Sequence, residues 1–463
     1  MALDYEEEGK DIGKKVITLA IPVLFENLFQ LLFSFVDMIF VGFLGATALA
    51  AVGFGMQIIN VILAVISALT TGTMVMVAYS VGAKRYKDLS DYLQISLNIG
   101  LYLSILILFY SIFGIEETLR MLGAKGELLK QTSVYLKYIL VPGILMVYMS
   151  IISSALRGAG DTKTPLYITI FSNTMNIFLD YVFVFGKFGF PKMEVAGAAL
   201  ATSISRLIGV ILLFLIIYNK NSLFKSFKII SLKIEKDKAF QILRIGIPTS
   251  VESLLFNVGA LIYATIVLKL GTKVYAAHRI SLNVESLSFQ PGFAFGVAAT
   301  ALVGQFKGAG EDKKALLASL EAWKRAVILM GTVGLILFLF PEYFVRIFSR
   351  DREVIRMSCS ALRIIAVIQP FLATANVMSG SLRGAGFSKI PMIYSGLGMW
   401  LIRIPLAYIL SIKLGLGLVG AWIAMATDIS FKAICSFYIF IIKKYYEKES
   451  IKLDKKYEPI SNS

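Results

Sequence analysis

Leu156-Arg157-Gly158-Ala159-Gly160 returns 226 residues later as Leu382-Arg383-Gly384-Ala385-Gly386, and this repeated stretch decides how the chain is organised. Other residues recur at the same separation and in the same register. They are Pro22 and Pro248, Glu26 and Glu252, Gly45 and Gly271, and Pro165 and Pro391. Chance does not maintain one register over so much sequence, so the chain consists of two homologous halves.

Long apolar segments fill both halves. Hydrophobic residues make up 57% of the 463 residues and charged residues 16%. A soluble protein carries about 25% charged residues, because its surface faces water. A helix needs roughly 20 apolar residues to cross a hydrocarbon core of about 30 Å. The sequence predicts twelve such segments, at residues 16–41, 52–80, 92–114, 132–156, 163–187, 195–218, 239–269, 275–305, 317–340, 354–382, 388–412 and 418–442.

Each half holds six predicted segments, so both halves enter the membrane from the same side. Such repeats are parallel and are related by an axis along the membrane normal. We therefore predict an all-α polytopic membrane protein with twelve transmembrane helices in two pseudo-symmetric six-helix lobes, a 6+6 parallel repeat. The predicted parts are an N-lobe at 1–218, a basic cytoplasmic interlobe linker at 219–238, a C-lobe at 239–444 and a charged cytoplasmic tail at 445–463.

The basic residues collect in short gaps on one side of the predicted membrane. Clusters such as 84–87 and 443–456 alternate with loops that are mostly poor in Lys and Arg. This pattern predicts that both termini are cytoplasmic, as in a multi-pass protein of the inner membrane. The net charge of +16 then reflects orientation, not binding to nucleic acid. The run 223–230 mixes bulky apolar residues with lysines and is either an interfacial segment or a solvated linker.

Two carboxylates and an amide are predicted to share one depth in the N-lobe. Asp37 lies in the outer half of the first helix, and Asp180 reaches a similar depth in the fifth helix at about 1.5 Å per residue. Asn176 precedes Asp180 by four residues and so lies on the same helix face. Ionisable groups inside a membrane are costly and usually face a cavity or a partner. The cluster could hold a shared proton or a sodium ion, or Asp180 could be a structural partner of Arg206.

Further acidic residues are candidates for a substrate cavity. Glu26 and Glu252 each follow a proline by four residues, in the inner part of a helix. They either attract cationic substrates or cap backbone groups that the prolines leave unpaired. Glu285 lies well inside another predicted helix, where it either faces the cavity or pairs with Arg279 or Arg403.

No pattern in the sequence predicts an enzyme. Cys359 and Cys435 both fall inside apolar runs, and the single histidine, His278, cannot form a His-rich zinc site. The run 415–420 fits G-x-G-x-x-G, but no strand precedes it. The sequence has no P-loop, no H-E-x-x-H and no G-x-S-x-G motif. We therefore predict no catalytic residues and no cofactor.

Several segments carry a family resemblance. They are Val36-Asp37-Met38-Ile39-Phe40-Val41-Gly42, the two Leu-Arg-Gly-Ala-Gly-x-x-Lys-x-Pro segments that begin at 156 and 382, Gly246-Ile247-Pro248, and Glu285-Ser286-Leu287. Together they resemble the multidrug and toxic compound extrusion (MATE) family, over nearly all twelve predicted helices. The resemblance implies two six-helix lobes that export organic, often cationic, compounds against an inward flow of protons or sodium ions.

The resemblance also implies an ion-coupling cluster in the N-lobe. DinF-type members of the family have such a cluster at positions that match Asp37, Asn176 and Asp180 here, with Thr202 as a companion. Pro22 matches a proline at which the first helix bends on protonation. A sodium ion at Asp37, Asn176 and Asp180 is the alternative to a proton.

The chain is expected to lie closer to DinF-type than to NorM-type members. The helix-7 acid of NorM-type members falls on Phe256 here, and helix 10 has no acid between Ala361 and Arg383. We therefore expect a monomeric secondary antiporter that exports lipophilic, often cationic, compounds in exchange for H+ or Na+ by alternating access. The alternative is a flippase of the same superfamily that moves a lipid-linked oligosaccharide, although such proteins tend to need a basic central cavity.

Overall fold

The computed structural model describes residues 2–219, 223, 224, 227, 234–448 and 451, with side chains described from residue 7 onward. These residues form helices and contain no strand. The elements are α1 (Ala2–Gly42), α2 (Ala46–Gly82), α3 (Tyr86–Phe109), η1 (Tyr110–Gly114), α4 (Ile115–Met121), α5 (Gly126–Leu140), α6 (Gly143–Ala159), α7 (Lys163–Phe185), α8 (Glu194–Tyr218), α9 (Lys236–Leu268), α10 (Thr272–Gly308), α11 (Asp312–Leu339), α12 (Pro341–Arg346), α13 (Arg352–Gly384), α14 (Lys389–Leu397), η2 (Gly398–Arg403), α15 (Ile404–Tyr408), η3 (Ile409–Lys413), α16 (Gly417–Phe437) and η4 (Tyr438–Ile442).

The predicted fold class is confirmed. Within the described part of the chain, 11 helices are long and apolar enough to cross a membrane, and the bent pair α5 and α6 brings the number to 12. Most of the run 223–230, which was predicted to be interfacial or a solvated linker, lies outside the described residues. The same is true of most of the predicted tail beyond residue 448.

The fourth predicted span differs from the sequence prediction in being bent. The apolar run 132–156 predicts one membrane span, whereas the structure has two helices here, α5 and α6, which meet at an angle of 52°. The bend lies at Pro142, which has no backbone N–H to donate to the preceding turn. Hydropathy depends only on how apolar a segment is and does not depend on the direction of the helix axis. The bend between α5 and α6 could therefore not be predicted from it.

Helix α1 is longer than the predicted span, because it begins at Ala2 and not near residue 16. Its first turns are rich in Glu and Lys, which form helices readily but lower the hydropathy that marks a membrane span. Both α1 and α9 contain an internal proline, Pro22 and Pro248. Each proline removes one backbone donor from the middle of a long helix.

The chain divides into two compact units. Unit 1 consists of residues 1–24, 82–84 and 247–463, and unit 2 consists of residues 25–81 and 85–246. The units therefore match the predicted halves except at the beginnings of α1 and α9 and at the short connection after α2. The predicted boundaries 1–218, 219–238, 239–444 and 445–463 follow the repeat and remain a prediction.

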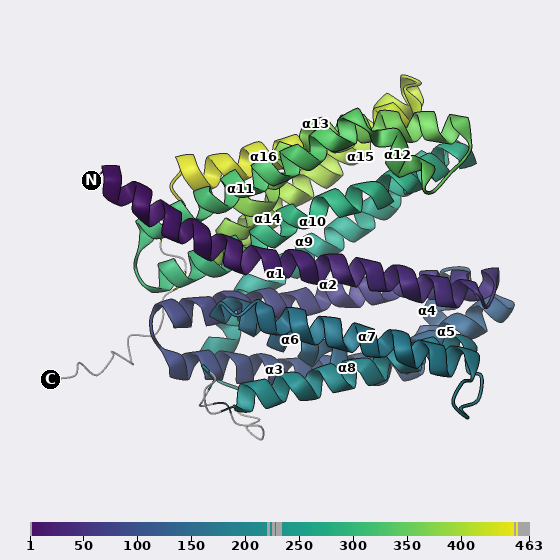
Figure 1. Ribbon diagram of the computed structural model, residues 1–463, viewed down its shortest axis with the longest axis horizontal. Helices are drawn as coiled ribbons and strands as arrows, with labels where there is room; N and C mark the ends of the chain where they lie inside the picture. Colours follow the sequence, from purple (N-terminus) through teal and green to yellow (C-terminus); the bar gives the residue numbers. More distant parts are fainter. Residues whose placement is uncertain (1, 220–222, 225–226, 228–233, 449–450, 452–463) are drawn as a thin grey trace. The chain divides into compact units, whose positions relative to one another are not determined.

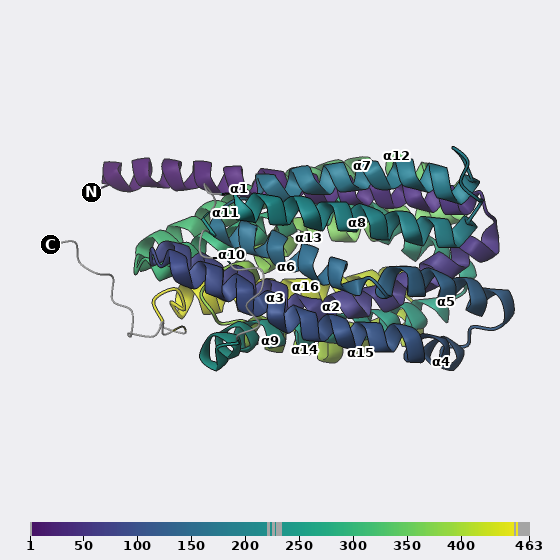
Figure 2. The same ribbon diagram turned by 90° about the horizontal axis from the view of Figure 1, so that it is seen from below.

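Each unit is a bundle of long helices. In unit 1, α13 packs against α10, α11 and α16 (Figure 1). In unit 2, α8 packs against α5, α6 and α7, and α3 packs against α6; α7 and α8 lie side by side in both views (Figures 1 and 2). Many of the polar residues considered below lie on these packed helices, and others lie on α1 and α9.

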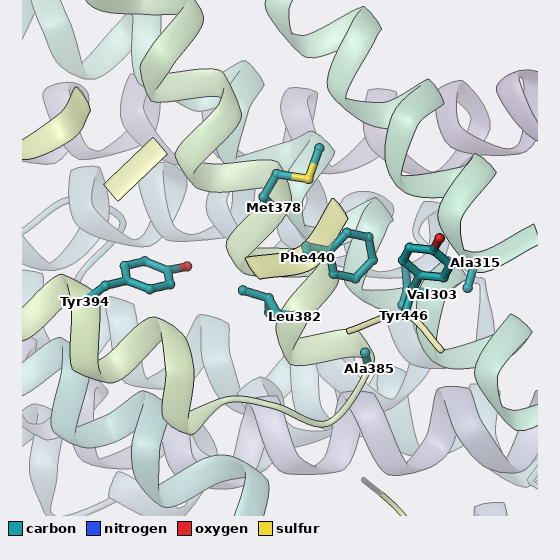
Figure 3. Packing of buried hydrophobic residues seen from close by; sticks show 8 residues of the cluster. All are labelled: Val303, Ala315, Met378, Leu382, Ala385, Tyr394, Phe440 and Tyr446. Carbon is teal, nitrogen blue, oxygen red and sulfur yellow. The ribbon is translucent and has the colours of Figure 1, made fainter. Parts of the chain in front are cut away.

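A buried aromatic and aliphatic cluster surrounds the end of α13. It consists of Val303, Ala315, Met378, Leu382, Ala385, Tyr394, Phe440 and Tyr446 (Figure 3). Leu382 is fully buried, and the Tyr394 hydroxyl lies 2.6 Å from Ser379 Oγ. Because Leu382 directly precedes Arg383, this packing fixes the position of an arginine that forms a buried ion pair, described below.

The repeated glycines permit the same close helix contact in both units. A Cβ atom at Gly158 would overlap the carbonyl oxygen of Met74, and one at Gly384 would lie 2.5 Å from the carbonyl oxygen of Thr300. Met74 and Thr300 are themselves related by the 226-residue repeat. The structure thus gives a packing reason for the glycine in both Leu-Arg-Gly-Ala-Gly segments.

We expect Gly384→Ala to lower the free energy of unfolding by about 1–3 kcal/mol, the usual effect of extra volume in a packed core. The new methyl group would press on the backbone of Thr300 and not on the flexible end of a side chain. Thermal unfolding in detergent measures the effect. Gly53→Ala is the matched control, because nothing lies within 4 Å of a Cβ atom there. Equal stability of the two variants would contradict the prediction.

Candidate ion-coupling site

Three helices of unit 2 bring the predicted cluster together. Asp37 lies on α1, Asn176 and Asp180 lie on α7, and Thr202 lies on α8. The spacing of four residues places Asn176 and Asp180 on one face of α7, and both side chains are buried. The four residues that the sequence singled out are therefore neighbours in the structure, although their role in coupling remains a prediction.

Asn176 joins the cluster through hydrogen bonds. In the amide orientation that satisfies both of its groups, its nitrogen donates to Asp37 Oδ1 and its oxygen accepts from the backbone N–H of Thr202, each over 3.2 Å. The Thr202 hydroxyl donates to the carbonyl oxygen of Ala198 over 3.0 Å. The carboxyl groups of Asp37 and Asp180 are close enough to form a hydrogen bond, which requires a proton on one of them.

Arg206 and Tyr135 complete the surroundings of the two carboxylates. The Arg206 guanidinium interacts electrostatically with Asp37, and the buried Tyr135 ring lies near both acids and Arg206. No ion pair joins Asp180 to Arg206 among the described residues, and Asp180 Oδ1 has no hydrogen-bond partner there. Arg206 follows Thr202 by four residues on α8, so the helical spacing was a signal that could have assigned it to this cluster.

The cluster contains few groups that could bind a metal ion. The described residues include no group of three or more His, Cys, Asp or Glu side chains arranged to hold one. Sodium would have to use Asp37, Asp180 and the oxygen atoms of Asn176 and Thr202. The Arg206 guanidinium is near Asp37 and would lie beside any cation bound there. The choice between a proton and a sodium ion remains a prediction.

Glu26 and Glu252 lie in matching ion pairs. Arg157 Nη2 donates to Glu26 Oε1 over 2.7 Å, and Arg383 Nη2 donates to Glu252 Oε2 over the same distance. A hydroxyl group adds to each pair: Thr169 Oγ1 lies 3.1 Å from Glu26 Oε1, and Ser395 Oγ lies 2.8 Å from Glu252 Oε1. All three members of the first set recur in the second at the repeat separation.

These pairs give the two glutamates arginine partners, whereas the structural alternative predicted from the sequence was the capping of backbone groups beside the prolines. Glu26 is 2% exposed and bound to the arginine of its own Leu-Arg-Gly-Ala-Gly segment. Glu26 Oε2, in contrast, is buried and has no hydrogen-bond partner among the described residues. The predicted cavity role of Glu26 and Glu252 remains untested.

A second group of buried charges lies in unit 1. Asp428 Oδ2 on α16 is 2.8 Å from Arg403 Nη2 and 3.0 Å from Lys432 Nζ. Gly398 makes room for this triad, because a Cβ atom there would overlap Asp428 Oδ1. Glu285 on α10 interacts electrostatically with Arg403 without forming a close ion pair in the described structure. Its predicted place in a substrate cavity stays a prediction.

The carboxylate cluster has no counterpart in the second half of the chain. The repeat relates Asp37 to Tyr263, Asn176 to Ile402 and Asp180 to Leu406. The scaffold contacts at Glu26 and Gly158 are thus present twice, whereas the pair of acids is present once. This asymmetry separates contacts that both units share from an acidic pair that only one of them has.

The repeat itself is matched by a known family. The family described as MatE matches residues 22–182 and 248–409, one stretch in each half. The chain belongs to the MatE family. A family relative from Thermotoga maritima, called a probable multidrug resistance protein NorM, is 37% identical over 448 residues, which are 96% of each chain. YoeA of Bacillus subtilis, also called a probable multidrug resistance protein, is 26% identical over 92% of this chain and 93% of its own.

Solved MATE structures share the fold. An outward-facing multidrug resistance MATE transporter of the MOP superfamily has a TM-score of 0.88 at 23% identity, covering 94% of this chain and 97% of its own. A MATE protein in a bent conformation has a TM-score of 0.87 at 24% identity, covering 96% and 99%. At this level of identity the likeness extends to the fold alone.

The MATE relatives do not support the predicted placement closer to DinF-type members. The Thermotoga relative bears the name NorM, as do several others. Their names also do not favour the flippase alternative. Phe256 still occupies the place predicted for the NorM-type acid, and its ring lies 5.9 Å from the Arg403 guanidinium carbon. The case for coupling in unit 2 therefore rests on the geometry of its acids and not on a subtype.

Proposed function

We propose that this MATE transporter is a secondary antiporter of the inner membrane that exports lipophilic, often cationic, compounds in exchange for protons. The observation that carries the proposal is the pair Asp37 and Asp180, which occurs in one half of the chain only. Intramembrane carboxylates without a tight ion pair are costly and are retained for transport of protons or ions.

The arrangement around the acids suits a reversible proton site. Two adjacent carboxylates disfavour each other's ionisation, so one proton is readily shared between them. The Asn176 amide and the Arg206 guanidinium stabilise the remaining negative charge at Asp37. Uptake and loss of the shared proton would change the net charge of the cluster, and this change would bias the transporter between two conformations.

Substrate selection is proposed to depend on charge as well as on apolar character. The names of the relatives describe multidrug resistance proteins, and broad specificity fits adaptable apolar side chains such as methionine and phenylalanine. If protonation of the acid pair and binding of a cationic substrate exclude each other, the substrate dissociates from the transporter when a proton binds. Alternating access of two lobes then converts a proton gradient into export.

The test is ethidium uptake into everted vesicles that contain the purified protein. A proton gradient and a sodium gradient are imposed separately. We expect the proton gradient to drive uptake and the sodium gradient to leave it at the level of empty vesicles. Ethidium uptake driven by the sodium gradient alone would identify sodium, and not the proton, as the coupling ion. Absence of uptake under either gradient, for ethidium and for other lipophilic cations, would contradict the proposed function.

A further inference from the structure

Four aromatic side chains meet at one end of unit 2, on the helices that carry the two acids. The Phe185 ring on α7 lies 5.8 Å from the Phe40 ring on α1, measured between ring centres, and the two ring planes meet at 78°. The rings of Phe43 and Tyr181 lie 6.4 Å and 6.1 Å from the same Phe185 ring. We call Phe40, Phe43, Tyr181 and Phe185 the aromatic cluster, and all four residues belong to unit 2.

The aromatic cluster lies directly beyond the acid pair. Phe40 follows Asp37 by three residues on α1, so it lies on the same helix face about 4.5 Å further along the axis. Phe185 follows Asp180 by five residues on α7, which is about 7.5 Å along that axis. Helices α1 and α7 are thus linked twice, first by their two carboxyl groups and then by their two rings.

Part of the aromatic cluster is open to its surroundings. Phe43 is 73% exposed and Tyr181 is 43% exposed, while Phe40 and Phe185 are half-buried. The Asp37 side chain beside them is also only partly covered. A small molecule could therefore touch the rings and the Asp37 carboxylate without entering the packed interior of unit 2.

The aromatic cluster, like the acid pair, has no counterpart in the second half of the chain. The residues at the repeat separation are Ile266, Lys269, Ala407 and Ser411. None of them is aromatic, and Lys269, which matches Phe43, carries a positive charge that repels other cations. The rings and the acids therefore occur together in one half of the chain and are absent together from the other.

Anchoring in the membrane interface is the ordinary role of exposed aromatic residues, and it explains these positions less well. Interfacial belts are rich in Trp and Tyr, whose rings combine an apolar body with a polar group. Three of the four members of the aromatic cluster are phenylalanines, which lack a polar group. A belt would also be expected at matching positions of both halves, where the sequence has no aromatic residues.

The chemistry of the aromatic cluster favours a cationic ligand. The face of an aromatic ring attracts cations, because its π electrons give it a partial negative charge. The attraction is significant within about 6 Å of the ring centre and is stronger where water is excluded. The Asp37 carboxylate, one turn away on the same helix face, adds a full negative charge. Rings and carboxylate together suit an organic cation that is itself aromatic, since its own ring can pack on those of the cluster.

We infer that the aromatic cluster and Asp37 form a binding subsite for an organic cation whose charge lies on or beside an aromatic ring. The inference rests on the proposed transport function, and it adds the substrate class and the residues that recognise it. When the acid pair takes up a proton, its attraction for the cation falls and the rings remain as the main contact. The cation is then held weakly enough to dissociate from the transporter.

Equilibrium binding of ethidium to the purified protein in detergent tests the subsite. Ethidium is suitable because its positive charge belongs to an aromatic ring system and its fluorescence rises on binding. We expect Phe185→Leu to weaken ethidium binding roughly three- to tenfold, the usual size of one cation–π contact. Phe185→Tyr keeps the ring and should bind ethidium within about twofold of wild type. Phe43→Leu is a second variant that should weaken binding, and the exposed position of Phe43 does not endanger folding.

Dependence on the charge of the ligand separates a cation site from simple apolar packing. A neutral phenylphenanthridine has the ring system of ethidium without its positive charge. We expect Phe185→Leu to change the binding of this neutral compound by less than about twofold. The matched control is Phe214→Leu, which removes a ring from another T-shaped pair of unit 2, formed by α6 and α8, and should leave ethidium binding unchanged.

The binding and transport measurements together distinguish the subsite from the proposed function. Equal losses for ethidium and the neutral compound would overturn the subsite, because the rings then contribute apolar contact alone. Unchanged ethidium binding in both leucine variants, with transport by wild-type vesicles, would overturn the subsite and leave the proposed function intact. Ring-dependent binding without transport under either gradient would support the subsite and count against the proposed function. Wild-type protein that neither binds nor transports ethidium would overturn both.

Discussion

Asp37→Asn should lower proton-driven ethidium uptake by roughly 10- to 100-fold, the range that typical coupling free energies produce. Asparagine keeps the size and hydrogen-bonding capacity of the side chain but cannot carry the charge that a proton neutralises. The shared site with Asp180 is then lost, while the Asn176 amide and the Arg206 guanidinium remain. Uptake into everted vesicles under an imposed proton gradient measures the change.

Two companion variants make this result specific. Asp180→Asn should cause a similar loss, because both carboxylates are needed to share one proton. Glu194→Gln is the matched control, since Glu194 is an exposed acid of the same unit that pairs only with Lys192 among the described residues. It should transport at the wild-type rate. Normal uptake by the double variant Asp37→Asn/Asp180→Asn would show that coupling takes place elsewhere.

The largest effect on stability is expected at Asp428. Asp428→Asn removes the only carboxylate within 4.0 Å of both Arg403 and Lys432 in the described structure, where Asp428 and Arg403 are buried and Lys432 is largely buried. An unpaired buried charge typically costs about 3–5 kcal/mol. We expect a loss of this size in the free energy of unfolding, visible as a lower melting temperature in detergent.

A second substitution in the triad of Asp428, Arg403 and Lys432 should restore part of the stability. Lys432→Met combined with Asp428→Asn removes one of the two stranded cations and should recover part of the lost stability. Glu353→Gln is the control at the surface, where the exposed pair with Lys273 contributes about 1 kcal/mol or less. A single Asp428→Asn variant as stable as Glu353→Gln would contradict the prediction.

The membrane spans could be predicted from the sequence because the bilayer imposes a length on every apolar helix. The repeat then fixed the relation between the halves, since Leu156–Gly160 and Leu382–Gly386 keep one register. The bend at Pro142 and the polar beginning of α1 were not predicted. Both depend on backbone hydrogen bonds and on packing, which the apolar character of a segment does not report.

The acids of the candidate site could be brought together from depth alone. Asp37 and Asp180 lie on different helices, and counting 1.5 Å per residue from the ends predicted to be cytoplasmic places them at one level. Tyr135 could not be found in this way, because its distance to the acids depends on how α5 packs against α8. The partners of Glu26 and Glu252 were predictable in retrospect: an acid and an arginine that recur together at one separation are candidates for a conserved contact within each repeat.

The matching ion pairs, Glu26 with Arg157 and Glu252 with Arg383, indicate that the two halves arose by duplication. Two halves that keep the same salt bridge, a hydroxyl beside it and the same tight glycine descend from one ancestral unit that already had these contacts. The acids at Asp37 and Asp180 exist in one descendant only, so they were gained there after duplication or lost from the other copy. Specialisation therefore followed doubling, and the second half became free to evolve its own polar interior.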